Sequence, residues 1–135
     1  MHKIIFFLIL SFFWACKAKD IKPKEANMIC YEFFVSGQFK HETYSLCSTV
    51  PVEIGYHYET GNWKFWNLKG QLIAEGPYTS QKIEIQGQGG CPYELIRGVM
   101  DKDKWNFWDD KGKPIKATED LINKLEACTA EFTAN

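Results

Sequence analysis

The sequence lacks the features that most readily indicate a function. It has no run of basic residues, and 16 Lys and Arg against 17 Asp and Glu give a net charge of −1. Nucleic-acid binding and polybasic attachment to a membrane surface both need clustered positive charge, so neither is predicted. No two cysteines are spaced as C-x-x-C, and no P-loop, dinucleotide fingerprint, nucleophile elbow or zinc-protease motif occurs. We therefore expect a protein that is not an enzyme and that binds no cofactor and no metal.

A long hydrophobic run is missing as well. The longest apolar-dominated stretch, residues 4–15, follows the basic start His2-Lys3. As a helix this stretch would span about 18 Å, short of the ~30 Å hydrocarbon core of a membrane. A basic start before such a short run is typical of a signal peptide over residues 1–15 rather than of a membrane span.

Cys16 follows this run directly after Ala15. The arrangement resembles the lipobox of bacterial lipoproteins, in which a cysteine after a small residue is lipidated and becomes the mature N-terminus. The resemblance implies lipidation of Cys16, a membrane anchor through that lipid, and a place in the bacterial cell envelope, either periplasmic or surface-exposed. The alternative is ordinary signal cleavage after Ala18. Residues 16–28 are polar and Lys-rich and predict a short tether, which leaves residues 29–135 as a single β-rich domain.

Five cysteines are an odd number for an exported protein. If Cys16 takes lipid, an even set remains in a compartment that permits disulfides. Four cysteines allow three connectivities, and the sequence does not choose among them. The alternative is that they are buried free thiols, packed as small hydrophobes. The candidate disulfide cysteines are Cys30, Cys47, Cys91 and Cys128.

Aromatic residues make up 16% of the chain and recur in a pattern. The pattern is an aromatic, any residue, Phe, an aromatic, two or three turn residues, Gly, any residue and an apolar residue. Each copy predicts a β-hairpin, because aromatics favour strands and the glycine supplies a positive φ at the turn. Residues 52–58 and 82–85 alternate with period two and predict further strands, with a loop at 86–90. The copies begin at Tyr31, Trp63 and Trp105, with turn glycines expected at Gly37, Gly70 and Gly112.

The repeated unit resembles the MORN-type repeat, in the variant found in many bacterial exported and antitoxin-annotated proteins. The residues from Gly61-Asn-Trp63 through Lys69-Gly70 to Glu75-Gly76-Pro-Tyr78 carry the resemblance best. It implies an antiparallel β-meander of repeated hairpins that serves as a scaffold or an interaction surface. The fold class expected is therefore mainly β, with one C-terminal α-helix.

The last part of the chain predicts that helix, over about residues 118–131. Thr118 is a suitable N-cap, and acidic residues follow in the first turn, where they suit the helix dipole. Apolar residues then recur on one stripe, which must dock on another element because so short a helix is marginal alone. The obvious dock is one face of the sheet. Cys128 on this stripe could form a disulfide to Cys30 or to Cys91.

Alternation along the strands places aromatics on both faces of the sheet. The helix can cover one face, so the row Phe34, Trp66 and Trp108 is a candidate binding face for a protein or glycan partner. The alternative is that the sheet curls and buries both sets of rings. The polar residues that could form a metal or acid–base site are interpreted instead as surface, packing or turn residues. They are His41, His57, Asp101, Asp103, Asp109 and Asp110.

The sequence therefore predicts a non-enzymatic, envelope-anchored lipoprotein that acts as a MORN-like scaffold or protein-binding module. One alternative is a small-ligand carrier, because Gly61-Asn-Trp63 resembles the Gly-x-Trp of lipocalin-like domains and a curled sheet can enclose a cavity. Another alternative is an inhibitor or immunity-type protein, as the antitoxin-annotated relatives of the repeat suggest. The partner itself is unknown, and no nucleic acid is expected.

Overall fold

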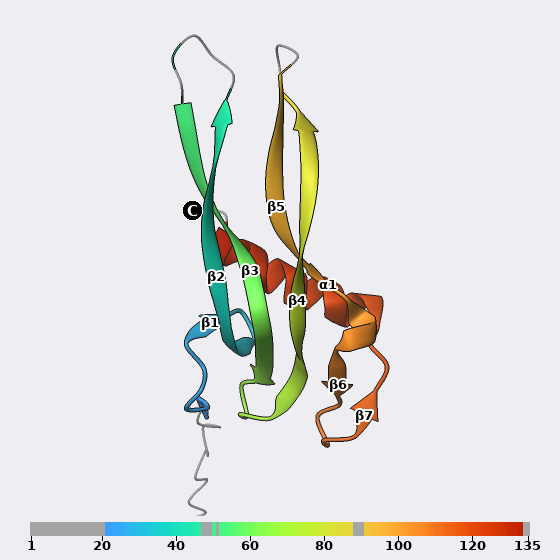
Figure 1. Ribbon diagram of the computed structural model, residues 1–135. Helices are drawn as coiled ribbons and strands as arrows, with labels where there is room; N and C mark the ends of the chain where they lie inside the picture. The colour runs from blue at the N-terminus through green and yellow to red at the C-terminus, as the bar shows by residue number, and fades with distance from the viewer. Residues whose placement is uncertain (1–20, 47–49, 51, 88–90, 134–135) are drawn as a thin grey trace, which may run out of the picture.

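The computed structural model describes residues 21–46, 50, 52–87 and 91–133. The predicted signal peptide, Cys16 and Cys47 lie outside these residues. The described part forms an antiparallel seven-stranded sheet with one helix at its C-terminal end, which confirms the predicted fold class (Figure 1). The elements are β1 Met28–Cys30, β2 Phe33–Leu46, β3 Val52–Asn67, β4 Leu72–Gln86, β5 Pro92–Met100, the 3₁₀ turn η1 Lys102–Lys104, β6 Asn106–Trp108, β7 Pro114–Ile115 and α1 Glu119–Thr133. In the described residues, no helix has the length and hydrophobicity needed to cross a bilayer.

The first four strands are neighbours in chain order, as in a meander. Besides β3, strand β4 has two further partners along its length, β5 from Tyr78 onwards and β6 at Ala74–Glu75. The ladder between β3 and β4 covers only the stretch from Gly61 to Trp66. Beyond that stretch the sheet divides into two hairpin arms, which Figure 1 shows side by side. We name residues 38–46 with 52–60 the first arm and residues 79–86 with 92–99 the second arm.

Tyrosine side chains join the two arms. The rings of Tyr44 and Tyr93 stack at 4.6 Å between centroids, with an interplanar angle of 12°. The backbone N–H of Ile96 donates to the hydroxyl of Tyr56 at 2.9 Å. Strand β5 is at the edge of the sheet there, so the N–H of Ile96 has no neighbouring strand to donate to. The hydroxyl of Tyr56 accepts its hydrogen bond instead. The arms are therefore held together by side chains rather than by a continuous ladder.

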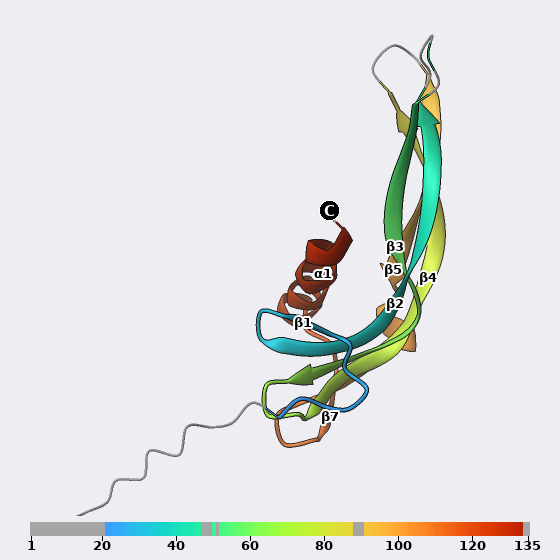
Figure 2. The same cartoon turned by 90° about the vertical axis from the view of Figure 1, so that its left-hand side faces the viewer.

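The sheet is strongly curved, and α1 packs on its concave side near the base of the arms (Figure 2). The core lies between them. Trp63 and Phe65 are 0% exposed, and Leu125 of α1 is equally buried against them. The predicted alternation is confirmed here, because Trp105 and Phe107 of the third unit join the same core. Four rings from successive segments meet edge to face, at 5.0, 5.3 and 5.4 Å between centroids. In order they are Phe39, Trp63, Tyr78 and Trp105.

Two of the three predicted turn glycines are confirmed. Gly70 and Gly112 have φ of 77° and 79° and lie in the β3–β4 and β6–β7 turns. The predicted turn at Gly37 is wrong, because Gly37 lies inside β2 at an irregularity in the β2–β3 register. A Cβ atom at Gly37 would overlap the indole of Trp63, so the residue is small to admit that ring rather than to form a turn. Tyr31, expected in a strand, lies in the β1–β2 turn with φ of 44° and is 72% exposed.

The sequence predicts a tether over residues 16–28. This prediction is wrong for residues 21–27, the part of the segment before β1 that the structure describes. Residues 21–27 pack against the sheet. The backbone N–H groups of Ile21 and Asn27 donate to the carbonyls of Leu68 and Val35, at 3.1 and 3.0 Å. Ala26 is 6% exposed. The domain therefore begins at least as early as residue 21, because this segment covers apolar side chains on the convex face.

The helix begins one residue after the predicted cap. Thr118 Oγ1 accepts from the N–H of Leu121 at 3.2 Å, which confirms the N-cap. Cys128 forms a disulfide with Cys30 and so fastens α1 to β1, one of the two pairings expected for it. Cys91 is also disulfide-bonded.

Candidate functional site

The predicted aromatic binding row is largely buried. Phe34 and Trp66 share a face, as predicted, and are opposite each other in the β2–β3 register. They are only 4% and 7% exposed, because Ala26 of the N-terminal segment packs on them as a second small core. Trp108 is half-buried. The prediction of an open aromatic row is therefore wrong for Phe34 and Trp66. Their side chains are buried, as the alternative interpretation expects.

The two histidines of the first arm pair with each other. His41 and His57 are opposite in the register, and their rings lie 4.9 Å apart in an edge-to-face arrangement. Both are exposed. His41 Nε2 lies over Gly55, 2.7 Å from the position of a Cβ atom there. In the part of the chain that the structure describes, no group of three or more His, Cys, Asp or Glu is placed to hold a metal ion.

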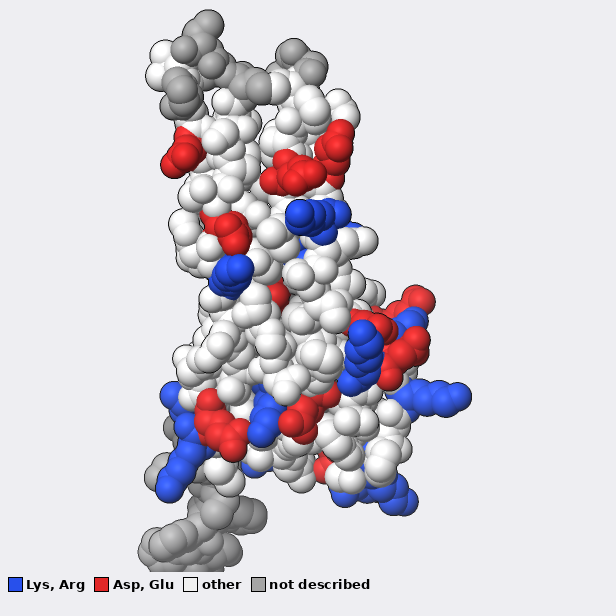
Figure 3. Space-filling model, viewed as in Figure 1, with Lys and Arg blue, Asp and Glu red and all other residues white. Residues whose placement is uncertain are grey.

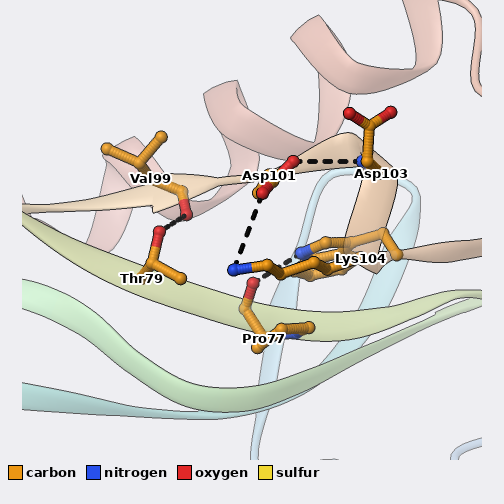
Figure 4. Close-up of polar contacts among 7 residues, drawn as sticks. Pro77, Thr79, Val99, Asp101, Asp103 and Lys104 are labelled. Atoms are coloured by element: carbon orange, nitrogen blue, oxygen red, sulfur yellow. Dashed lines mark hydrogen bonds and ion pairs between the residues drawn. The ribbon is translucent and has the colours of Figure 1, made fainter.

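The acidic residues of the third unit mostly support backbone turns. Figure 4 shows Asp101 accepting from the N–H of Asp103 at 3.2 Å, while Lys104 Nζ lies 3.7 Å from the same carboxylate. Asp109 accepts from the N–H groups of Lys111 and Lys113, both at 2.9 Å. These bonds satisfy donors at the start of η1 and in the β6–β7 turn. The turn role expected of Asp101 and Asp109 is confirmed.

Charges of both signs share the convex base of the molecule, where Figure 3 shows acidic and basic side chains alternating. Lys64 lies between two carboxylates there, with Nζ 2.9 Å from Glu25 and 3.9 Å from Glu75. These pairs tie the N-terminal segment to β3 and β4. An alternating row of this kind presents no field of one sign to a partner.

The concave side holds two open clefts between α1 and the second arm. The larger, about 800 Å³, lies beside η1 and the N-terminal end of α1. The smaller, about 310 Å³, lies against Glu126 and Thr129 of α1, at the point where the two arms diverge. We name the smaller one the Tyr78 pocket. Its principal lining residues are Glu59 of β3, Tyr78 of β4, Arg97 and Gly98 of β5, and Glu126 and Thr129 of α1.

The Tyr78 pocket contains a buried hydroxyl without a partner. Tyr78 is 7% exposed, and its OH forms no hydrogen bond to any described residue. The nearby hydroxyl of Thr129 donates instead to the carbonyl of Glu126 at 3.1 Å. Such a group keeps its full desolvation cost unless something else binds it, and buried polar groups without partners are rare.

The carboxylate of Glu59 reaches this pocket because position 98 has no side chain. A Cβ atom at Gly98 would lie 2.7 Å from Glu59 Oε2 and 2.7 Å from the Glu59 carbonyl oxygen. The guanidinium of Arg97 donates twice to Gln81 Oε1, at 2.9 and 3.1 Å, across the β4–β5 ladder. These bonds fix the guanidinium along the β4–β5 ladder, and Arg97 forms no ion pair with Glu59 or Glu126 in the described residues.

The phenol of Tyr78 is held in its neutral form. Burial raises its pKa well above 10, the side chain of Thr129 opposes this in part, and the carboxylates of Glu59 and Glu126 raise the pKa further. A phenol of this kind acts at ordinary pH as a neutral hydrogen-bonding group and not as a phenolate.

This raised pKa predicts a loss of stability in alkali. Below pH 10 both folded and unfolded chains carry the proton, so Tyr78 gives no pH dependence. Above pH 10 the unfolded state loses the proton while the folded state retains it, so the free energy of unfolding falls, by up to about 1.4 kcal/mol per pH unit from this group. In Tyr78→Phe this part of the fall should vanish, and stability at pH 8 should change little, because the variant removes a buried hydroxyl with no partner.

Urea denaturation at several values from pH 8 to pH 11 measures the effect. Tyr44→Phe is the matched control, since it removes a phenol on the first arm outside the pocket and should keep the alkaline fall. If the free energy of unfolding fell equally with pH in Tyr78→Phe and in the native chain, the claim that the phenol of Tyr78 is buried and neutral would be contradicted.

The sequence did not single out this pocket. Glu59, Tyr78 and Glu126 come from three elements that only the folded sheet brings together, and their spacing follows no motif. The one available signal was that Tyr78 belongs to the best copy of the repeated unit. No family model matches the chain, and none of the curated proteins or solved structures is detectably similar to it.

Proposed function

We propose that this chain is a non-enzymatic, lipid-anchored binding module of the bacterial cell envelope, whose two arms present the surface for a protein partner. The observation that carries the proposal is the position of the arms. Residue 21 lies at the base, where the carbonyl of Ile21 approaches Gly70 in the β3–β4 turn, whereas the arms extend from the opposite end of the sheet (Figure 1). A membrane anchor at Cys16 would thus enter at the base and leave the arms pointing away from the membrane.

The joined arms support binding rather than storage of a ligand. Stacking of Tyr44 on Tyr93 and the bond from Ile96 to Tyr56 fix one arm against the other, which lowers the entropy that a partner must overcome. A carrier of the lipocalin kind needs an enclosed cavity lined by aromatics. Trp63 and Phe65 fill that interior position themselves, with neither side chain exposed. We therefore favour the binding module over the carrier.

Site-specific photo-crosslinking in the native envelope tests the proposal. A photoreactive residue at Thr43 or Lys82, exposed positions on the first and second arms, should give one discrete adduct. The matched control places it at Lys111, exposed in the β6–β7 turn at the base, where that adduct should not form. In the Cys16→Ser chain, fractionation should find the protein released from membranes. Adducts only from Lys111, or unchanged membrane retention of Cys16→Ser, would contradict the arm surface and the lipid anchor respectively.

A further inference from the structure

We propose that the Tyr78 pocket binds a primary ammonium group. This goes beyond the proposed function and does not depend on the lipid anchor or on the arm surface. The site lies at the base of the arms, where Glu59 of the first arm and Arg97 and Gly98 of the second arm meet α1.

Three residues with acceptor oxygens, from three elements, line the pocket. The acceptors are the carboxylate of Glu59 on β3, the hydroxyl oxygen of Tyr78 on β4 and the carboxylate of Glu126 on α1. A primary ammonium carries three N–H donors around one nitrogen, so it can bind all three at once. Tyr78 is the decisive member, because the residue is 7% exposed and no described group meets the geometry of a hydrogen bond to its hydroxyl, although the Thr129 side chain lies nearby. An ammonium there would supply the missing hydrogen bond.

The charge of the pocket also fits a cation. Two carboxylates line it, and neither Glu59 nor Glu126 forms an ion pair with any Lys or Arg in the described ranges. Arg97 also lines the pocket, but its guanidinium is hydrogen-bonded to Gln81, so the two carboxylates leave the lining with an excess of negative charge. Charge-assisted hydrogen bonds from an ammonium to carboxylates are about twice as strong as neutral ones.

Other cations fit less well. Calcium takes six to eight oxygen ligands, usually with several carboxylates, and the described residues contain no group of three such acidic or imidazole ligands. A quaternary ammonium binds the faces of aromatic rings, whereas this pocket presents a phenol hydroxyl. The volume of about 310 Å³ leaves room for the carbon chain that carries the nitrogen. That chain could belong to a free amine or to a lysine side chain of a protein partner.

Tyrosine NMR on the full chain in detergent tests the proposal. The ring-carbon signal of Tyr78, assigned by its loss in Tyr78→Phe, is followed during titration with n-propylammonium chloride. We expect a saturable shift, and we expect n-propanol, tetramethylammonium and calcium chloride to give none. Glu59→Gln and Glu126→Gln should each weaken binding by about tenfold or more, which is the loss of one hydrogen bond to a charged group. Glu94→Gln, on the exposed side of the second arm, is the matched control and should leave the titration unchanged.

The source of the ammonium is distinguished by a further pair of probes. A lysine blocked at both backbone ends but free at Nζ should shift Tyr78 if the ligand is a protein side chain, and its Nζ-acetylated form should not. A shift with n-propylammonium alone assigns the pocket to free amines. The signals of Tyr44 and Tyr93 report whether each variant remains folded. The proposal is overturned by equal shifts with n-propanol, by a shift with calcium alone, or by full-strength titration in folded Glu59→Gln and Glu126→Gln.

Discussion

Replacing both cysteines of the Cys30–Cys128 disulfide with alanine is expected to lower the free energy of unfolding by about 2–5 kcal/mol. The bond closes a loop with a sequence separation of 98 residues, and for a loop of that order chain entropy alone predicts about 4.7 kcal/mol. It also fastens α1, whose 15 residues would be marginal as an isolated helix. Thermal melts should show a fall in Tm on the order of 10–20 °C.

The matched control for this variant is Cys91→Ala. Cys91 lies at the start of β5, far from α1, and its replacement breaks the other disulfide while leaving Cys30–Cys128 intact. Helix content is therefore expected to melt early in the double variant and late in Cys91→Ala. Equal loss of α1 in both variants would contradict the assignment of Cys30–Cys128 as the bond that holds the helix.

Trp63→Ala is expected to lower the free energy of unfolding by about 3–5 kcal/mol. Trp63 is fully buried and contacts Phe39, Tyr78 and Phe65 at centroid distances of 5.0, 5.3 and 6.2 Å. Its Nε1 donates to the carbonyl of Thr60 at 3.0 Å, so the variant also leaves that acceptor without its donor. The space left open between the sheet and α1 would be too large to close by small shifts.

Trp108→Ala is the control for that measurement, because it removes the same side chain from a half-buried position in β6. Urea denaturation should give a loss clearly smaller than that of Trp63→Ala. Equal losses would mean that Trp108 is as much a part of the core as Trp63, and any open surface at β6 would then be ruled out.

Local sequence predicted the elements whose cause is itself local. Gly70 and Gly112 form turns because a positive φ costs glycine little, and Thr118 caps α1 because its hydroxyl lies within reach of a free N–H. Alternation placed Trp63 and Phe65 on one face and Trp66 on the other, since successive side chains of a strand point in opposite directions.

Gly37 shows where local reasoning fails. The residues around it repeat the pattern of the true turns, yet β2 continues through this position because β3 pairs with it on both sides. Gly37 leaves room for the indole of Trp63 on the neighbouring strand, and Gly76 leaves room for the indole of Trp105 in the same way. A glycine needed for a turn and one needed for close packing look alike in a sequence, so only the neighbouring strand distinguishes them.

The sequence also did not predict that the N-terminal segment covers Phe34 and Trp66. Their face was predicted correctly, but the residues that close it precede the sheet and have the polar composition of a tether. A few apolar contacts from Ala26 and the backbone bonds of Ile21 and Asn27 suffice to bind that segment. Composition alone does not reveal such contacts, because they depend on the direction in which the segment leaves the sheet.

The sequence by itself determined an antiparallel sheet of aromatic strands and its final helix, and it predicted two real glycine turns together with a third that is not one, because all of these follow from the preferences of neighbouring residues. Only the tertiary structure decided which faces are covered, that Cys128 pairs with Cys30, and that Glu59, Tyr78 and Glu126 line one pocket. The physical reason is that burial and charge placement depend on segments far apart in the chain, which the curvature of the sheet and the docking of α1 bring into contact.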